Sequence, residues 1–175
     1  MKLLINYLIA IIYTLIFFKC SDGNSLSHGC KDCNAINYDS LAVIDDSSCF
    51  FSNSNIISSY SVQDSIMEFS LSWLFDDYLI EITREDCLPN GILIKNYGNI
   101  SNSDGSLIVR GIAIEDSIYI PSQIIDTGKD NFSTDYIEIS ESTGYFKNDS
   151  IFIALSYSNR YDPYIGNLFG TKIDN

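Results

Sequence analysis

The chain has 175 residues, of which 23 are acidic and 10 are basic, and its net charge at pH 7 is −13. No part of it clusters Lys and Arg. Because phosphate binding needs clustered cations, this composition excludes nucleic acid as a partner. The length suffices for one domain with a real core.

The first twenty residues, MKLLINYLIAIIYTLIFFKC, have the anatomy of a signal peptide. Lys2 precedes an apolar run from Leu3 to Phe18, and Lys19 and Cys20 follow it. A run of this length rises only about 24 Å as a helix, short of a hydrocarbon core of about 30 Å, so an uncleaved anchor is the weaker alternative. A cysteine closing such a run resembles the lipidation box of Bacteroidota lipoproteins.

This resemblance implies that Cys20 becomes the lipidated first residue of an outer-membrane lipoprotein that faces the periplasm or the cell surface, with secretion as the alternative. Removal of residues 1–19 leaves 8 basic and 23 acidic residues, a net charge of −15. Such acidity is typical of a soluble surface whose copies repel one another, and cation binding is the other interpretation. The expected organisation is a signal peptide (1–19), a lipidated cysteine and tether (20–27), a cysteine-rich module (28–51), a linker (52–59) and a β domain (60–175).

The module, HGCKDCNAINYDSLAVIDDSSCFF, holds three cysteines and the chain's only histidine. Outside the cytoplasm thiols oxidise, so two disulfides are expected among Cys30, Cys33, Cys49 and Cys87, with three possible connectivities. A zinc site that adds His28 is a weaker alternative, because its thiolates would have to survive oxidation. A CxxC redox pair needs a βαβ context, and a loop follows here instead.

The module also resembles a short repeat of secreted and surface proteins of Bacteroidota, G-C-x-D-x-x-A-x-N-Y-x-x-x-A-x-x-D-D-G-S-C. The match covers residues 29–49, with Ser47 in place of the usual glycine and Ile36 where an extra cysteine is often found. We expect Cys30 to bond Cys49 and close a tied loop, which removes about 3 kcal/mol of unfolded-state freedom. A bond from Cys33 to Cys87 would then pin the module onto the β domain.

Inside this loop a small apolar cluster is expected, formed by Ala35, Tyr38, Leu41, Ala42 and Ile44. Four carboxylates offer oxygens to calcium, namely Asp32, Asp39, Asp45 and Asp46. Their spacing is not that of an EF-hand loop, and Asx-turns or helix caps explain them without metal. No other cofactor is predicted.

From Tyr60 onward the hydrophobic period changes to two, which predicts strands. The expected strands are 67–73, 78–83, 92–97, 107–114, 117–121, 135–140, 144–147, 150–157 and 168–173. Turns at 115–116 and 148–149 would make two hairpins whose Ile118, Ile120, Ile151 and Ile153 point inward. The fold class is all-β, an antiparallel sandwich or a small up-and-down barrel of about eight strands.

The order of the stretches ILIKNYGNI, IAIEDSIYIPSQ and STGYFKNDSIFIALSY resembles a domain of small Bacteroidota lipoproteins. That resemblance implies a calycin-like β domain. It implies little about activity.

No nucleophile motif is present, and the adjacent carboxylate pairs fall at expected turns, so an enzyme is not predicted. Near the C-terminus an aromatic cluster, Tyr157, Tyr161 and Tyr164 with Phe169, could form an exposed platform for a sugar or peptide, with Arg160 as a contact for a carbohydrate or carboxylate. Equally, these rings could close the bottom of the barrel. The expected function is a non-enzymatic binding or assembly module with an unknown protein or glycan partner; a carrier of a small apolar ligand and a purely structural protein are the alternatives.

Overall fold

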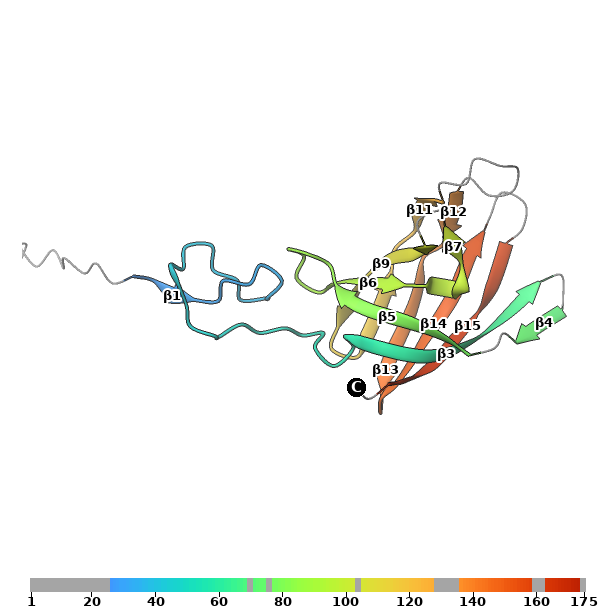
Figure 1. Ribbon diagram of the computed structural model, residues 1–175, viewed down its shortest axis with the longest axis horizontal. Helices are drawn as coiled ribbons and strands as arrows, with labels where there is room; N and C mark the ends of the chain where they lie inside the picture. The colour runs from blue at the N-terminus through green and yellow to red at the C-terminus, as the bar shows by residue number, and fades with distance from the viewer. Residues whose placement is uncertain are drawn as a thin grey trace, which may run out of the picture.

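The computed structural model describes residues 26–68, 71–74, 77–102, 105–127, 136–158 and 163–173. It confirms the predicted fold class: eight antiparallel strands form a closed up-and-down barrel, and a small cysteine-rich module precedes it (Figure 1). Among the described residues no helix is long and apolar enough to cross a bilayer.

The barrel follows chain order, so every strand pairs with the next one. Its strands are β3 (Ser58–Glu68), β5 (Tyr78–Arg84), β6 (Gly91–Lys95), β9 (Ile108–Ile114), β10 (Ser117–Ile120), β13 (Ser142–Lys147), β14 (Ser150–Ser158) and β15 (Pro163–Lys172). β15 then pairs with β3, from Ile165 opposite Met67 to Lys172 opposite Tyr60. Because this last pairing closes the ladder, these eight strands leave no free edge along their paired lengths.

Short additional elements extend the barrel strands. β4 (Leu71–Leu74) folds back on β3, so the stretch 67–73 predicted as one strand is two antiparallel ones, with Glu68 opposite Leu71. β11 (Gln123–Asp126) and β12 (Tyr136–Ile139) pair with each other, and β12 also pairs with β14. The remaining elements are the short pair β7 (Ser101–Asn102) and β8 (Gly105–Ser106), and the 3-10 turn η1 (Tyr97–Asn99).

Proline separates β10 from β11. Pro121 has no N–H to donate to a ladder, and β10 ends at the residue before it. Past this break the side chain of Gln123 takes the place of a backbone pair. Its amide accepts from the Arg110 N–H (3.0 Å) and donates to the Arg110 carbonyl (2.8 Å), so β9 stays joined to this strand.

The two predicted hairpins form as expected. Ser117 lies opposite Ile114 across the turn at 115–116, and Ser150 lies opposite Lys147 across the turn at 148–149. In the second turn Asn148 and Asp149 both have positive φ, as a two-residue hairpin turn of type I′ requires. The four isoleucines predicted to point inward are all buried.

The core fills the barrel with alternate residues of every strand. Along β14 the pattern is strict, since Ile151, Ile153, Leu155 and Tyr157 are buried and the residues between them are partly exposed. Isoleucine dominates the fully buried side chains, and its branched Cβ suits a pleated, packed surface. Side chains of this size occupy the interior that eight strands enclose.

The module lies beyond one end of the barrel (Figure 1). Its own sheet is minimal: β1 (His28–Gly29) pairs in parallel with β2 (Ile44–Asp45). A linker joins it to β3, and Ser52 on that linker donates to the Asn90 side chain beside β6. The module is therefore tied to the barrel by more than its peptide chain.

Candidate functional site

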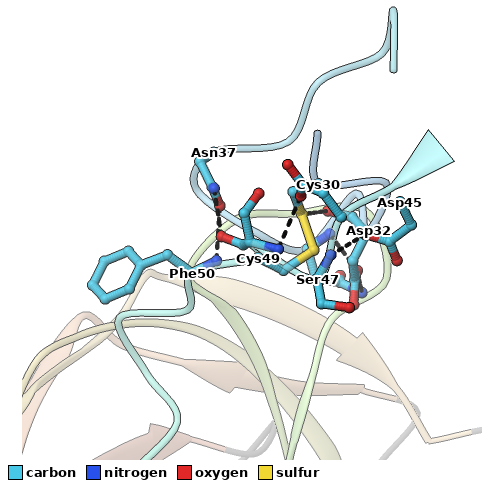
Figure 2. Close-up of a disulfide and its surroundings, with 10 residues drawn as sticks. Cys30, Asp32, Asn37, Asp45, Ser47, Cys49 and Phe50 are labelled. Atoms are coloured by element: carbon cyan, nitrogen blue, oxygen red, sulfur yellow. Dashed lines mark hydrogen bonds between the residues drawn. A yellow bond between two sulfur atoms is a disulfide. The ribbon is translucent and has the colours of Figure 1, made fainter. Parts of the chain in front are cut away.

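Both expected disulfides are present in the structure. Cys30 is bonded to Cys49, 19 residues apart, and this bond closes the module loop (Figure 2). Cys33 is bonded to Cys87 in the turn between β5 and β6, 54 residues away. The second bond joins the module to the barrel, as expected. Lipidation at Cys20 stays a prediction, because this residue lies outside the described ranges.

The four aspartates proposed for calcium each make a local turn. Asp32, Asp39, Asp45 and Asp46 accept through Oδ1 from the backbone N–H two residues ahead, at 2.8 to 3.1 Å. Figure 2 shows the bond from Ser47 to Asp45. These are Asx-turns, the alternative considered above. Within the described residues no three of these carboxylates lie close enough to share an ion. Calcium stays a prediction that this geometry does not support.

The expected apolar cluster of the module is only half formed. Ala35 and Ala42 are buried, but Tyr38, Leu41 and Ile44 are exposed, with 80% of Leu41 open to solvent. The prediction that these three large side chains fold inward is wrong. The buried apolar residues of this loop are all small, namely Cys30, Ala35 and Ala42.

The structure bears on the two interpretations of the aromatic cluster near the C-terminus through Tyr157, Tyr164 and Phe169. Tyr157 on β14 is 8% exposed and faces the barrel interior, where its ring stacks on Tyr164 of β15 at 5.0 Å between centroids. The alternative, in which these rings close one end of the barrel, fits this placement. Arg160 and Tyr161 lie outside the described residues. Phe169, by contrast, points outward and is 55% exposed.

Polar groups gather inside the barrel near this tyrosine pair. Asp64 on β3 is 1% exposed, and its Oδ2 accepts from the Tyr78 hydroxyl at 3.0 Å. Burial raises the pKa of the Asp64 carboxyl. Burial also raises the pKa of Tyr78, and the charge of Asp64 adds to this effect. Tyr157 and Tyr97 also lie near enough to Tyr78 to raise its pKa through their charge.

Three of these interior polar atoms have no hydrogen-bond partner among the described residues: Asp64 Oδ1, the Tyr97 hydroxyl and the Ser142 hydroxyl. Burial raises the pKa of Tyr97 to about 12, and the nearby Ser142 hydroxyl lowers it slightly. The two hydroxyls are thus neighbours without the geometry of a full hydrogen bond. Buried polar atoms without partners usually mark a bound water or a small ligand.

A second candidate site lies on the outer wall of the barrel, where neighbouring strands are in register. Tyr145, Phe152 and Phe169 stand directly opposite one another across β13, β14 and β15. The rings of Tyr145 and Phe152 stack at 5.3 Å between centroids. Tyr145 and Phe169 are each more than half exposed. We call these three residues the aromatic row.

Two residues further along each strand, the outer wall changes from large to small side chains. Ala154, Asn167 and Ser65 lie opposite one another across β14, β15 and β3, and Ser156 lies opposite Ile165 in the next row. This step in side-chain size leaves a groove of about 540 Å³, whose lining also includes Glu141 and Thr143. We call it the outer groove.

The polar side chains of the outer groove are available to a ligand. Within the described part of the chain, Ser65, Thr143, Ser156 and Asn167 make no side-chain hydrogen bond, and Glu141 makes no ion pair. These residues were not predicted as a site. The strand alternation of 150–157 implied that Ala154 and Ser156 point outward, but no pattern in the sequence shows that β15 lies between β14 and β3.

A further cleft of about 530 Å³ lies between the module and the barrel. It is lined by Ile36 and Phe50 of the module and by Ile114 at the end of β9. Phe50 projects away from the Cys30–Cys49 bond (Figure 2). At the next residue, Phe51, the Arg84 guanidinium lies 4.3 Å from the ring centroid, a cation–π contact that joins the module to the barrel.

Comparison with known proteins adds no family to this picture. No model of a protein family matches the chain, and no curated protein matches it either.

Proposed function

We propose that this protein is a non-enzymatic binding or assembly module of the bacterial cell envelope. In this proposal a lipid on Cys20 anchors the chain, the disulfide-tied module spaces it from the membrane, and the barrel presents its outer wall to a partner. The anchor rests on the sequence resemblance described above. The binding role rests on the barrel.

The observation that carries the binding role is the outer groove next to the aromatic row. Most interior positions of the barrel are occupied by buried apolar side chains, whereas Tyr145 and Phe169 remain exposed on the outside. Exposed aromatic side chains grouped beside a groove are typical of interaction sites, because burying them against a partner recovers hydrophobic free energy. Although the protein is highly acidic, the lining of the outer groove contains a single charged residue, Glu141.

The chemistry of the groove supports binding rather than catalysis. Its lining contains one carboxylate, Glu141, and no histidine, cysteine, lysine or arginine. A hydroxyl nucleophile needs an adjacent general base to activate it, and within the described residues the Glu141 carboxylate is not paired with a hydroxyl of the lining. Hydroxyl and amide side chains, in contrast, recognise a polar ligand without reacting with it.

Photo-crosslinking tests the binding role. A photoreactive residue placed at Asn167 should capture a partner in the envelope of living cells, and the same probe at Leu79, exposed on β5, is the matched control. Equal capture at both positions, or none at Asn167, would contradict a specific outer-wall site. Metabolic labelling with a fatty-acid probe tests the anchor separately, since Cys20→Ala should abolish the label.

A carrier of a small ligand is the second candidate, favoured by the three unpartnered polar atoms inside the barrel. These atoms would suit a ligand that brings its own donors and acceptors to Asp64, Tyr97 and Ser142. Native mass spectrometry of the protein as purified from cells distinguishes the two. A retained mass that is lost in Asp64→Asn supports the carrier, and an unliganded mass supports the outer-wall proposal.

A further inference from the structure

We infer that the outer groove binds a neutral carbohydrate chain. This inference rests on the proposed function and names the ligand of the same site. It is argued from the hydrogen-bonding groups of the groove, its charge, its flanks and the closure of the barrel.

The hydrogen-bonding groups match a polyol. Ser65, Thr143 and Ser156 carry hydroxyls, and each hydroxyl both donates and accepts; the Asn167 amide does the same with separate atoms. Sugar hydroxyls have the same dual character, so either partner can adjust to the other. A ligand with donors only or acceptors only would leave half of this capacity unused, at a cost in desolvation.

The charge of the groove excludes most other polar ligands. No cation lines it, so phosphate, sulfate and carboxylate groups find no counter-charge, and the net charge of −13 repels them further. Glu141 is the only charged residue of the lining, and it can accept hydrogen bonds from sugar hydroxyls. A neutral, hydroxyl-rich ligand needs no counter-charge and is not repelled by the net negative charge of the protein.

The flanks supply the apolar contact that a sugar ring also needs, because the C–H groups of a pyranose form apolar faces. Ile165 is 60% exposed at one side of the groove, and the aromatic row follows at the other. The row spans three strands spaced about 4.8 Å apart, so a ligand that crosses the strands meets several apolar groups in succession.

The closed ladder argues against an extended peptide. Peptides that bind to sheets gain affinity mainly by adding a strand at a free edge. Here β14 and β15 each have neighbours on both sides, so their backbone groups are already paired. A ligand on this wall can therefore be recognised only by side chains. The hydroxyl and amide side chains of the groove suit a sugar.

Calorimetry with defined probes tests the inference on the protein as purified from cells. The probes are cellohexaose, maltohexaose and mannohexaose as neutral chains, polygalacturonate as an acidic chain, and a library of unstructured peptides. At least one neutral hexasaccharide should bind. Asn167→Ala should weaken it about tenfold, the loss expected from one or two hydrogen bonds, and Ala154→Phe should abolish it by filling the groove.

Thr171→Ala is the matched control, because Thr171 is exposed on the same face of β15 outside the groove. This variant should bind the hexasaccharide as tightly as the wild type does. An unchanged melting temperature shows that Ala154→Phe is folded. Binding of a neutral chain that survives Ala154→Phe overturns the inference. Binding of polygalacturonate or peptide alone would also overturn the inference, but it would leave the proposed binding function intact. If no probe binds and the photoreactive residue at position 167 captures nothing, the carbohydrate inference and the proposed binding function both fail.

Discussion

In the barrel the large apolar side chains point inward, and Ile92, Ile94 and Ile153 are completely buried. In the module the large apolar side chains point outward, and Leu41, Val43 and Phe50 are each more than half exposed. The barrel therefore gains stability from hydrophobic burial, whereas the module relies on disulfides and Asx-turns. The difference shows that one chain uses two means of stabilisation, each suited to the number of residues available.

The largest effect should come from emptying the barrel core. Ile94→Ala should lower the free energy of unfolding by about 2–5 kcal/mol, because it removes three buried carbons and leaves a cavity. Leu79→Ala, on the neighbouring strand but 60% exposed, is the control and should change stability by less than about 0.5 kcal/mol. Denaturant unfolding measures both. Similar values for the two variants would contradict the filled barrel.

The second largest effect should come from removing the disulfide that closes the module loop, and the loss of stability should be confined to the module. Replacing both Cys30 and Cys49 by Ala removes the bond that closes the loop, worth about 3 kcal/mol to the module. Hydrogen exchange at the Asp39 amide, which donates to the Cys30 carbonyl, should then become fast. The melting temperature of the barrel should stay the same. A cooperative loss of both regions would show that they fold as one unit.

A smaller effect is expected at the break in the barrel wall. Gln123→Ala removes the two hydrogen bonds that join its side chain to the Arg110 backbone and should cost about 1–2 kcal/mol. Gln63→Ala, an exposed glutamine of β3, should cost much less. Thermal unfolding of the two variants provides the measurement, and equal midpoints would mean that solvent replaces the Gln123 bonds without loss.

The smallest effects are those of pH, and they should have opposite signs in the two regions. Hydrogen bonds from Ser48 hold the pKa of Asp46 below its ordinary value of 3.8. The turn that the Asp46 carboxylate stabilises is therefore intact above pH 3.8 and weakens as the pH falls through the lowered pKa. Burial raises the pKa of Asp64, so the folded barrel binds this proton more tightly than the unfolded chain does. Its contribution is fully present below the ordinary value of 3.8 and is lost as pH rises through the raised pKa.

Two measurements check these signs. Exchange of the Ser48 amide should accelerate as the pH falls below 3.8, after correction for intrinsic rates. The stability of Asp64→Asn relative to the wild type should improve as the pH rises above 3.8, because the variant has no carboxylate to ionise. An Asp64→Asn difference that does not vary with pH would mean that this carboxyl is solvated in the folded protein.

Much of the barrel could be predicted because its strands alternate in hydrophobicity. The stretches at 78–83 and 117–121 were predicted to within a residue or two at each end. β15 begins five residues before its predicted start, because Pro163, Gly166 and Asn167 are typical of turns. The first part of β3 was missed because its serines, Gln63 and Asp64 conceal the alternation.

The candidate sites were harder to predict, for a physical reason. The outer groove joins Ser65 to Asn167 across the closing pair of strands, and such a contact depends on barrel closure rather than on any local pattern. The interior cluster likewise brings Asp64 of β3 and Tyr97 of η1 near Tyr78 of β5. The cysteine count predicted two disulfides but left three connectivities open. The resemblance of residues 29–49 to a repeat selected the pairing that the structure shows.

The Cys33–Cys87 bond gives the molecule a mechanical property. A pull on the N-terminal end reaches Cys30 and then Cys33, and from Cys33 it passes through sulfur to the turn beyond β5. This bond therefore shares the load with the linker that follows Cys49. The linker that enters β3 lies inside the loop of chain that this bond closes. The Cys33–Cys87 bond therefore limits how far a pull on the module can extend the linker, and so how far it can separate β3 from β15.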